Sequence, residues 1–260
     1  MVVSGNLEDN SATFSPTLWP SGKPATMKTL VTLALLSAGL TGCVLTERAP
    51  YEEFAPPGGQ GPVVIVLSGT SGPHDYIFFA KNLAAQGYYV ALLDGKRFPA
   101  DDGRGDENLR QVILQAEHSP HATPGKVGVV GLSLGSAGVL AHASTQPDLV
   151  SVVLAYYPST RDIHDKEAVI RRWQVPTVVF AGTSDNAREQ NGCCLIENVE
   201  AMAASATERG APFDLVVYPH VQHGFNLAIS GKFDRPATED AWQRTLTALR
   251  QNLGSQRGPA

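Results

Sequence analysis

Hydrophobic residues from Tyr51 onward fall into short apolar runs that alternate with stretches of helical periodicity. The apolar runs are rich in β-branched residues and predict strands. They cover residues 63–67 (VVIVL), 88–93 (YYVALL), 126–130 (KVGVV), 150–155 (VSVVLA), 176–181 (PTVVFA) and 213–218 (FDLVVY). The helical stretches lie near residues 76–86, 106–118, 134–146, 194–209 and 237–252. Apolar strands that alternate with helices predict an α/β fold, in which helices cover both faces of a mostly parallel central sheet.

The segment before this pattern divides into three parts. Residues 1–26 are polar and interrupted by prolines, so we expect a disordered extension, or a chain whose true start is Met27. Residues 27–42 hold a lysine, an apolar run and a small-residue end, and we return to them below. Residues 43–62, which include APPGGQGP at 55–62, predict a linker, and residues 63–253 predict one folded domain.

Residues 27–42 and the cysteine that follows them resemble a bacterial lipoprotein signal peptide. The resemblance rests on Met27-Lys28, on the apolar run from 29 to 40, and on Leu40-Thr41-Gly42-Cys43. It implies that Cys43 is acylated and becomes the first mature residue, which anchors the protein by lipid in the bacterial cell envelope. A transmembrane anchor is the alternative, but an apolar run of about 12 residues is shorter than the roughly 20 that a span requires.

Composition narrows the function classes. The chain has 260 residues, of which 43% are hydrophobic and 17% charged, as in ordinary globular proteins. A formal net charge of −5 without a basic cluster argues against nucleic acid as a partner. Three cysteines are too few for a disulfide scaffold.

A candidate nucleophile lies in Gly131-Leu132-Ser133-Leu134-Gly135, directly after one predicted strand and directly before a predicted helix. A G-x-S-x-G pattern alone is weak, and a plain glycine-rich turn is the alternative. The context favours a functional serine, because a strained turn between strand and helix needs small neighbours and lifts the serine hydroxyl above the carboxyl edge of the sheet.

A serine nucleophile needs a base that takes its proton and a carboxylate that orients the base. Asp185 follows the predicted strand at 176–181, and His220 and His223 both follow the strand at 213–218. We choose His223, because the Gly224-Phe225 that follows it resembles the catalytic loop of hydrolases with this fold. The predicted triad is therefore Ser133, Asp185 and His223.

Three longer motifs resemble the dienelactone hydrolase family of α/β-hydrolases. They are PGKVGVVGLSLGSAG (124–138), AGTSDN (181–186) and RGAPFDLVVYPHVQHGFN (209–226), and the likeness extends over roughly residues 60–252. The resemblance implies the α/β-hydrolase fold and its order of nucleophile, acid and base. The enzymes that give the family its name use cysteine at the position of Ser133, so this chain looks like a serine-using esterase branch, to which lactone specificity does not transfer.

Acyl transfer also requires donors for the oxyanion. The α/β-hydrolase pattern takes one N–H from the residue after the nucleophile, here Leu134, and one from the loop after an early strand. In the loop Ser68-Gly69-Thr70-Ser71-Gly72 we choose Thr70, with Ser71 as the second candidate. Related hydrolases commonly have His-Gly where this loop has Ser68-Gly69. The loop lacks the motifs of nucleotide-binding sites, and we expect no cofactor.

Histidines and cysteines outside the predicted triad give little sign of further chemistry. The pairs His118/His121 and His220/His223 lack a third ligand at recognisable spacing, so no metal site is predicted. For the vicinal Cys193-Cys194 we expect a free pair near the rim of the active site, with a strained vicinal disulfide as the alternative.

These features together predict a lipid-anchored serine hydrolase that cleaves small-molecule carboxylic esters through an acyl-enzyme. About 20 residues around 159–173 remain for a lid after strands and helices are assigned, which favours a small or medium acyl group. Two alternatives stay open: a serine peptidase or amidase, since the same triad cleaves amides, and a catalytically silent hydrolase fold that acts as an envelope binding protein.

Overall fold

The computed structural model describes residues 51–185 and 192–253, and the side chain of Ile229 is not described. The predictions for residues 1–50, including the signal peptide and Cys43, lie outside these residues. Within the described residues, no helix combines the length and the apolar character that a membrane span needs.

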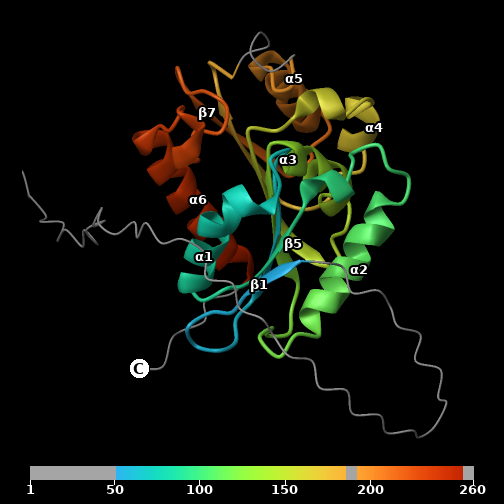
Figure 1. Ribbon diagram of the computed structural model, residues 1–260. Coiled ribbons are helices and arrows are strands. Elements are labelled where there is room, and N and C mark those ends of the chain that lie inside the picture. The colour runs from blue at the N-terminus through green and yellow to red at the C-terminus, as the bar shows by residue number, and fades with distance from the viewer. Residues whose placement is uncertain (1–50, 186–191, 254–260) are drawn as a thin grey trace, which may run out of the picture. The chain divides into compact units, whose positions relative to one another are not determined.

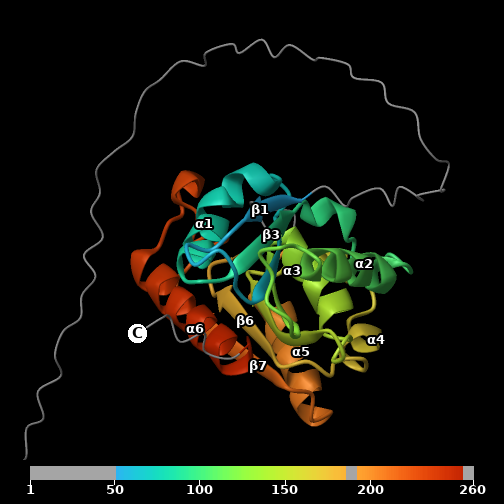
Figure 2. The same ribbon diagram turned by 90° about the horizontal axis from the view of Figure 1, so that it is seen from below.

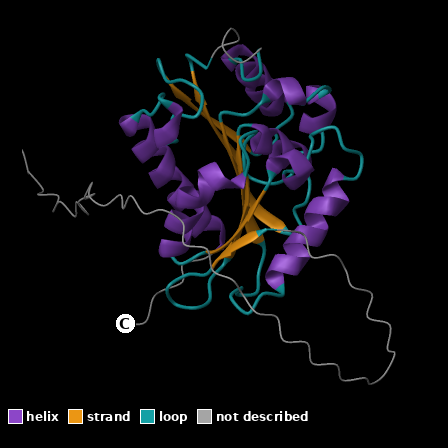
Figure 3. Ribbon diagram, viewed as in Figure 1, coloured by secondary structure: helices purple, strands orange, loops and turns teal. Residues whose placement is uncertain are grey.

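The described residues form a seven-stranded sheet flanked by helices (Figures 1 and 3). The strands are β1 Glu52–Phe54, β2 Val63–Leu67, β3 Tyr89–Leu93, β4 Val127–Leu132, β5 Val150–Tyr156, β6 Thr177–Gly182 and β7 Phe213–Tyr218. The helices are α1 Ile77–Ala85, α2 Gly105–Glu117, α3 Leu134–Gly138, α4 Lys166–Ile170, α5 Ile196–Glu208 and α6 Arg235–Leu253. Short 3-10 helices cover Pro73–Tyr76, Gly95–Arg97, Thr160–Asp162 and Ala228–Ser230, and a π-helix covers Val139–Ala143.

The sheet has the strand order β1-β3-β2-β4-β5-β6-β7. Among the described strands, β1 alone runs antiparallel to its neighbour, and the others pair in parallel. This confirms the predicted α/β class. In β2 every residue is buried, because Val63, Ile65 and Leu67 face one layer of helices while Val64 and Val66 face the other.

Each face of the sheet has its own core. The first packs against α2, α4, α5 and the π-helix, and the second packs against α1 and α6. Figure 2, seen from below, shows the same division, with α1 and α6 on one side of the strands and α2 and α4 on the other. Helices on both faces leave the carboxyl edge of the sheet as the place where loops gather.

The structure corrects two parts of the predicted organisation. Strand β1 lies inside the predicted linker 43–62; the segment Glu52–Phe54 has no apolar pattern and is ordered by its ladder with β3, in which Phe54 pairs with Val90. The helix predicted at 134–146 divides into α3 and the π-helix, and the short α4 was not predicted. The other predicted strands and helices are confirmed to within a few residues at each end.

Candidate active site

Ser133 occupies the turn between β4 and α3 with φ 55° and ψ −112°, a backbone conformation that is strained for a residue with a side chain. Close packing makes glycine necessary on both sides. A Cβ on Gly131 would lie 2.6 Å from the carbonyl oxygen of Gly135, and a Cβ on Gly135 would lie 2.2 Å from the carbonyl oxygen of Leu67. The tight turn expected from the sequence is therefore present.

The loops that follow β6 and β7 are tied together beside this turn. The amide of Ser184 donates a hydrogen bond to the carbonyl oxygen of Val221 (3.0 Å), and the amide of Thr183 donates to that of Tyr218 (3.0 Å). Because β6 and β7 are neighbours in register, these bonds bring Asp185 and His223 to the same edge of the sheet.

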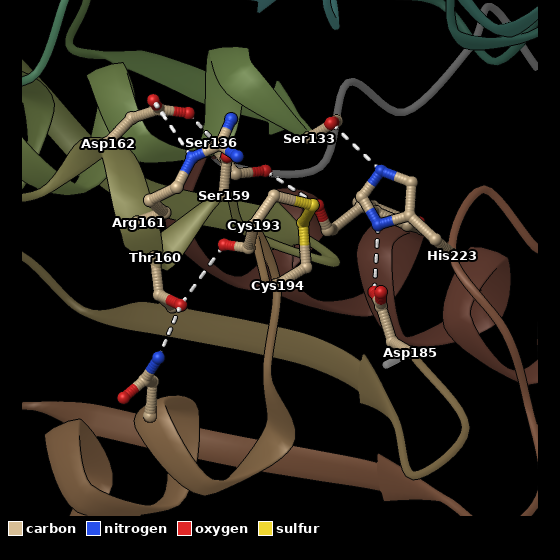
Figure 4. The surroundings of a disulfide bond; sticks show 12 residues. Ser133, Ser136, Ser159, Thr160, Arg161, Asp162, Asp185, Cys193, Cys194 and His223 are labelled. Carbon is tan, nitrogen blue, oxygen red and sulfur yellow. Dashed lines mark hydrogen bonds and ion pairs between the residues drawn. A yellow bond between two sulfur atoms is a disulfide. The ribbon is translucent and has the colours of Figure 1, made fainter. Parts of the chain in front are cut away.

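Ser133, His223 and Asp185 form a continuous chain of hydrogen bonds (Figure 4). His223 Nε2 lies 2.9 Å from Ser133 Oγ, and His223 Nδ1 lies 2.8 Å from Asp185 Oδ2. A carboxylate only accepts, so Nδ1 donates its proton to Asp185 and Nε2 accepts the hydroxyl proton of Ser133. The other candidate, His220, is exposed in a turn, where its amide donates to the Thr183 hydroxyl.

Burial sets the electrostatics of this chain. Ser133 is 7% exposed and Asp185 4% exposed, while the His223 side chain keeps 13% of its surface. Removal from water raises the pKa of Asp185, and this effect outweighs the hydrogen bond and the charge of His223, which lower it. A carboxylate held in such a dry site interacts strongly with any positive charge that develops on the imidazole.

Two aromatic residues, Tyr157 and Phe225, pack beside His223, and the sequence pattern did not single out Tyr157. The ring of Tyr157 meets the imidazole edge to face at 4.7 Å between centroids, and its hydroxyl donates to Asn226 Oδ1 (2.6 Å). Phe225 is fully buried against Tyr157, with ring centroids 5.5 Å apart. Tyr157 directly follows β5, and its position at the carboxyl end of a central strand was the available signal.

The loop after β2 passes beside Ser133. A Cβ on Gly69 would lie 3.2 Å from Ser133 Cβ and 2.3 Å from the hydroxyl of Tyr76. Thr70 and Ser71 follow Gly69 and are exposed, and Leu134 begins α3, where the first amides have no partner within the helix. The assignment of oxyanion donors to Leu134 and Thr70 stays a prediction.

Cys193 and Cys194 form a vicinal disulfide, contrary to the expected free pair. Gly192, with φ 72°, begins the turn that contains both cysteines. The carbonyl oxygen of Cys193 accepts hydrogen bonds from the Arg161 amide (2.9 Å) and from the Thr160 hydroxyl (3.3 Å). Figure 4 shows the disulfide with Thr160 and Arg161 on one side and the His223 ring on the other.

The profile of the dienelactone hydrolase family matches residues 92–253. A Yersinia pestis protein described as a candidate carboxymethylenebutenolidase is 24% identical over 222 residues, which cover 75% of this chain and 79% of that protein.

Solved structures share the fold. A crystal structure of a candidate dienelactone hydrolase from Klebsiella pneumoniae aligns with a TM-score of 0.62 and 20% identity, and the match covers 74% of this chain and 88% of that chain. An acylaminoacyl peptidase of Pyrococcus horikoshii aligns with a TM-score of 0.58 and 14% identity, over 81% of this chain and 41% of that chain. The described strands therefore have the arrangement of the α/β-hydrolase fold.

Proposed function

This chain belongs to the dienelactone hydrolase family and is a hydrolase of the α/β-hydrolase fold, and we propose that it cleaves carboxylic esters through a serine acyl-enzyme. The observation that carries the proposal is the hydrogen-bonded chain of Ser133, His223 and Asp185. A serine hydroxyl is a weak nucleophile unless a base is within hydrogen-bond reach and is itself oriented. The chain of contacts meets both conditions at the strained turn of Ser133.

The proposed reaction has two halves. In the first, His223 Nε2 takes the hydroxyl proton as Ser133 Oγ attacks the ester carbonyl, and Asp185 stabilises the imidazolium through Nδ1. The oxyanion receives hydrogen bonds from the amides of Leu134 and Thr70, with Ser71 as the second candidate. His223 then protonates the leaving alcohol, and the acyl group stays on Ser133.

In the second half, water attacks the acyl carbonyl and gives a proton to His223. Collapse of this second tetrahedral intermediate breaks the bond between the acyl carbon and Ser133 Oγ. His223 returns its proton to Ser133, which restores the starting state and releases the carboxylic acid.

We propose a small or medium acyl group as the substrate. The segment around residues 159–173, from which a lid would be built, is tied to the body of the domain. Trp173 stacks on Phe213 and donates to the carbonyl oxygen of Leu140 (2.7 Å), and Glu167 pairs with Arg209 (2.7 Å). A series of p-nitrophenyl esters of increasing acyl length tests this, because activity that peaks at long chains would contradict it.

A fluorophosphonate probe followed by peptide mass spectrometry tests the nucleophile. We expect modification at Ser133 in the wild type and none in Ser133→Ala or His223→Ala. His220→Ala is the matched control, because this neighbouring histidine is exposed, lies outside the hydrogen-bonded chain, and should leave labelling intact. A folded wild type that does not label would contradict the proposal and favour a binding protein.

We also propose that the mature chain is anchored by a lipid on Cys43 at a bacterial cell envelope. The support is Leu40-Thr41-Gly42-Cys43 and the short apolar run before it. Growth of the native host with labelled palmitate should label the wild type and leave Cys43→Ser unlabelled. An intact mass that retains residues 1–26 would contradict processing at this site.

A further inference from the structure

The Cys193–Cys194 disulfide lies against the proposed catalytic base. The two sulfurs and one ring nitrogen of His223 all lie within 4.8 Å of one another. The cysteines are 8% and 3% exposed, and they come from the connection between β6 and α5, whereas His223 comes from the connection between β7 and α6. Among the described residues, Cys193, Cys194 and His223 are the histidine, cysteine and carboxylate side chains that lie close enough together to bind one metal ion.

Backbone contacts hold the cysteines beside His223 independently of the bond between their sulfurs. The carbonyl oxygen of Cys193 accepts from the Arg161 amide and from the Thr160 hydroxyl. Thr160 is fully buried and also accepts a hydrogen bond from the Asn198 side chain in α5 (3.4 Å). Cleavage of the disulfide therefore leaves two thiols next to the imidazole.

We propose that the reduced Cys193–Cys194 pair and His223 form a binding site for a thiophilic divalent cation of the Zn²⁺ class, and that the bound ion switches off the active site. Two thiolates and one imidazole are a donor set that Zn²⁺ prefers, and three protein ligands leave a fourth position for water. Zn–S bonds of about 2.3 Å and Zn–N bonds of about 2.0 Å place tetrahedral ligand atoms roughly 3.5 Å apart. The ligand atoms are already within 4.8 Å, so small side-chain rotations suffice.

Asp185 strengthens the case for His223 as a ligand. Histidines that bind metals commonly hold a carboxylate through the other ring nitrogen, which fixes the ring and makes it a better ligand. His223 already has such a partner in Asp185. Whichever nitrogen binds the ion gives up its hydrogen bond to Ser133 or to Asp185, so the chain of contacts required for catalysis is broken.

Opening of the cation site requires a dithiol reductant, which reduces the Cys193–Cys194 disulfide. The reductant supplies two electrons and two protons, the S–S bond breaks, and the reductant becomes a disulfide. The cation then displaces the two thiol protons to solvent as the thiolates bind it. In the oxidised protein both sulfurs are occupied, and the active site is free of this inhibition. The effect on catalysis rests on the proposed function, whereas the binding of the cation does not.

The test compares oxidised and reduced full-length protein. One sample is reduced with dithiothreitol and desalted without oxygen, and both samples are titrated with Co²⁺, whose thiolate absorption band reports binding without any need for activity. Reduced wild type should bind one Co²⁺ with this band, and oxidised wild type should show none. Zn²⁺ should then lower hydrolysis of a short p-nitrophenyl ester by about 100-fold or more in the reduced sample, as loss of a general base does, and EDTA should restore it.

Variants decide whether the cysteines carry the effect. The double variant Cys193→Ser/Cys194→Ser should show no band and no dependence of Zn²⁺ inhibition on reduction, whatever its basal rate, and Cys194→Ser alone serves if the double variant does not fold. Cys43→Ser is the matched control and should show the same cobalt band and the same Zn²⁺ inhibition as the wild type. Equal inhibition of oxidised and reduced wild type would overturn the proposal, as would reduced protein without the cobalt band. A cobalt band in protein that hydrolyses no ester would leave the metal site standing and contradict the proposed function.

Discussion

Replacement of Gly135 by alanine tests whether the packing between α3 and the β2 loop sets the geometry of catalysis. The new Cβ would lie 2.2 Å from the carbonyl oxygen of Leu67 and 2.6 Å from that of Ser68, and both are backbone atoms that cannot rotate away. Ordinary contact begins near 3.4 Å, so the start of α3 and the end of β2 must separate by about 1 Å.

The expected loss of activity depends on which residues move when α3 and β2 separate. Gly69, the next residue of the loop, already lies against Ser133, and Thr70 follows it. A displacement of about 1 Å in this loop moves the proposed oxyanion donor away from the amide of Leu134 and should lower kcat/KM by about 100-fold. The free energy of unfolding should change less than the activation free energy does. Overpacking costs about 1–3 kcal/mol, and the higher helix propensity of alanine offsets about 1 kcal/mol of that cost.

Hydrolysis of a short p-nitrophenyl ester and urea unfolding measure the two quantities separately. Gly103→Ala is the matched control, because a Cβ there meets no atom within 4 Å and the backbone φ is not positive. This variant should keep the wild-type rate. A Gly135→Ala protein with the wild-type kcat/KM would refute the reasoning, because it would show that the loop accommodates the methyl group without moving the reacting atoms.

Three further predictions follow from burial in and around the site. Burial raises the pKa of the Asp185 carboxyl above 3.8, so the folded protein keeps this carboxyl protonated to higher pH than the unfolded chain does. The carboxyl therefore contributes less to the stability of the fold as pH rises from 3.8 through its pKa in the folded protein. Asp185→Asn, which is inactive in the proposed mechanism, should therefore unfold at a higher urea concentration than the wild type at neutral pH; a difference that persists below pH 3.8 would contradict this origin. Tyr157→Phe keeps the ring but removes the hydrogen bond to Asn226, and should lower the free energy of unfolding by about 1 kcal/mol in a denaturant titration. Phe225→Ala should cost about 3–5 kcal/mol, because the side chain is fully buried among aromatic rings, and an unchanged thermal midpoint would show that the packing is looser than described.

The hydrophobic pattern determined most of the fold, because it records burial directly. Residues 63–67 and 213–218 were predicted with the bounds that β2 and β7 have. Strand β1 escaped prediction because its residues are mostly exposed and it depends on pairing with β3, a partner distant in sequence. Local pattern therefore predicts elements that bury a face, and misses elements that exist only as an edge.

The chemistry divides in the same way. The sequence by itself placed Ser133 on a tight turn and Asp185 and His223 after two later strands, because strand ends in a parallel sheet share one edge. The choice of His223 over His220 came from the likeness of Gly224-Phe225 to a catalytic loop, and the structure gives its contact with Ser133. Only the tertiary structure decided that Tyr157 packs on the His223 ring and that the cysteine pair is joined beside it. These contacts join residues from separate connections of the chain, and no local pattern encodes which distant side chain fills the space next to another.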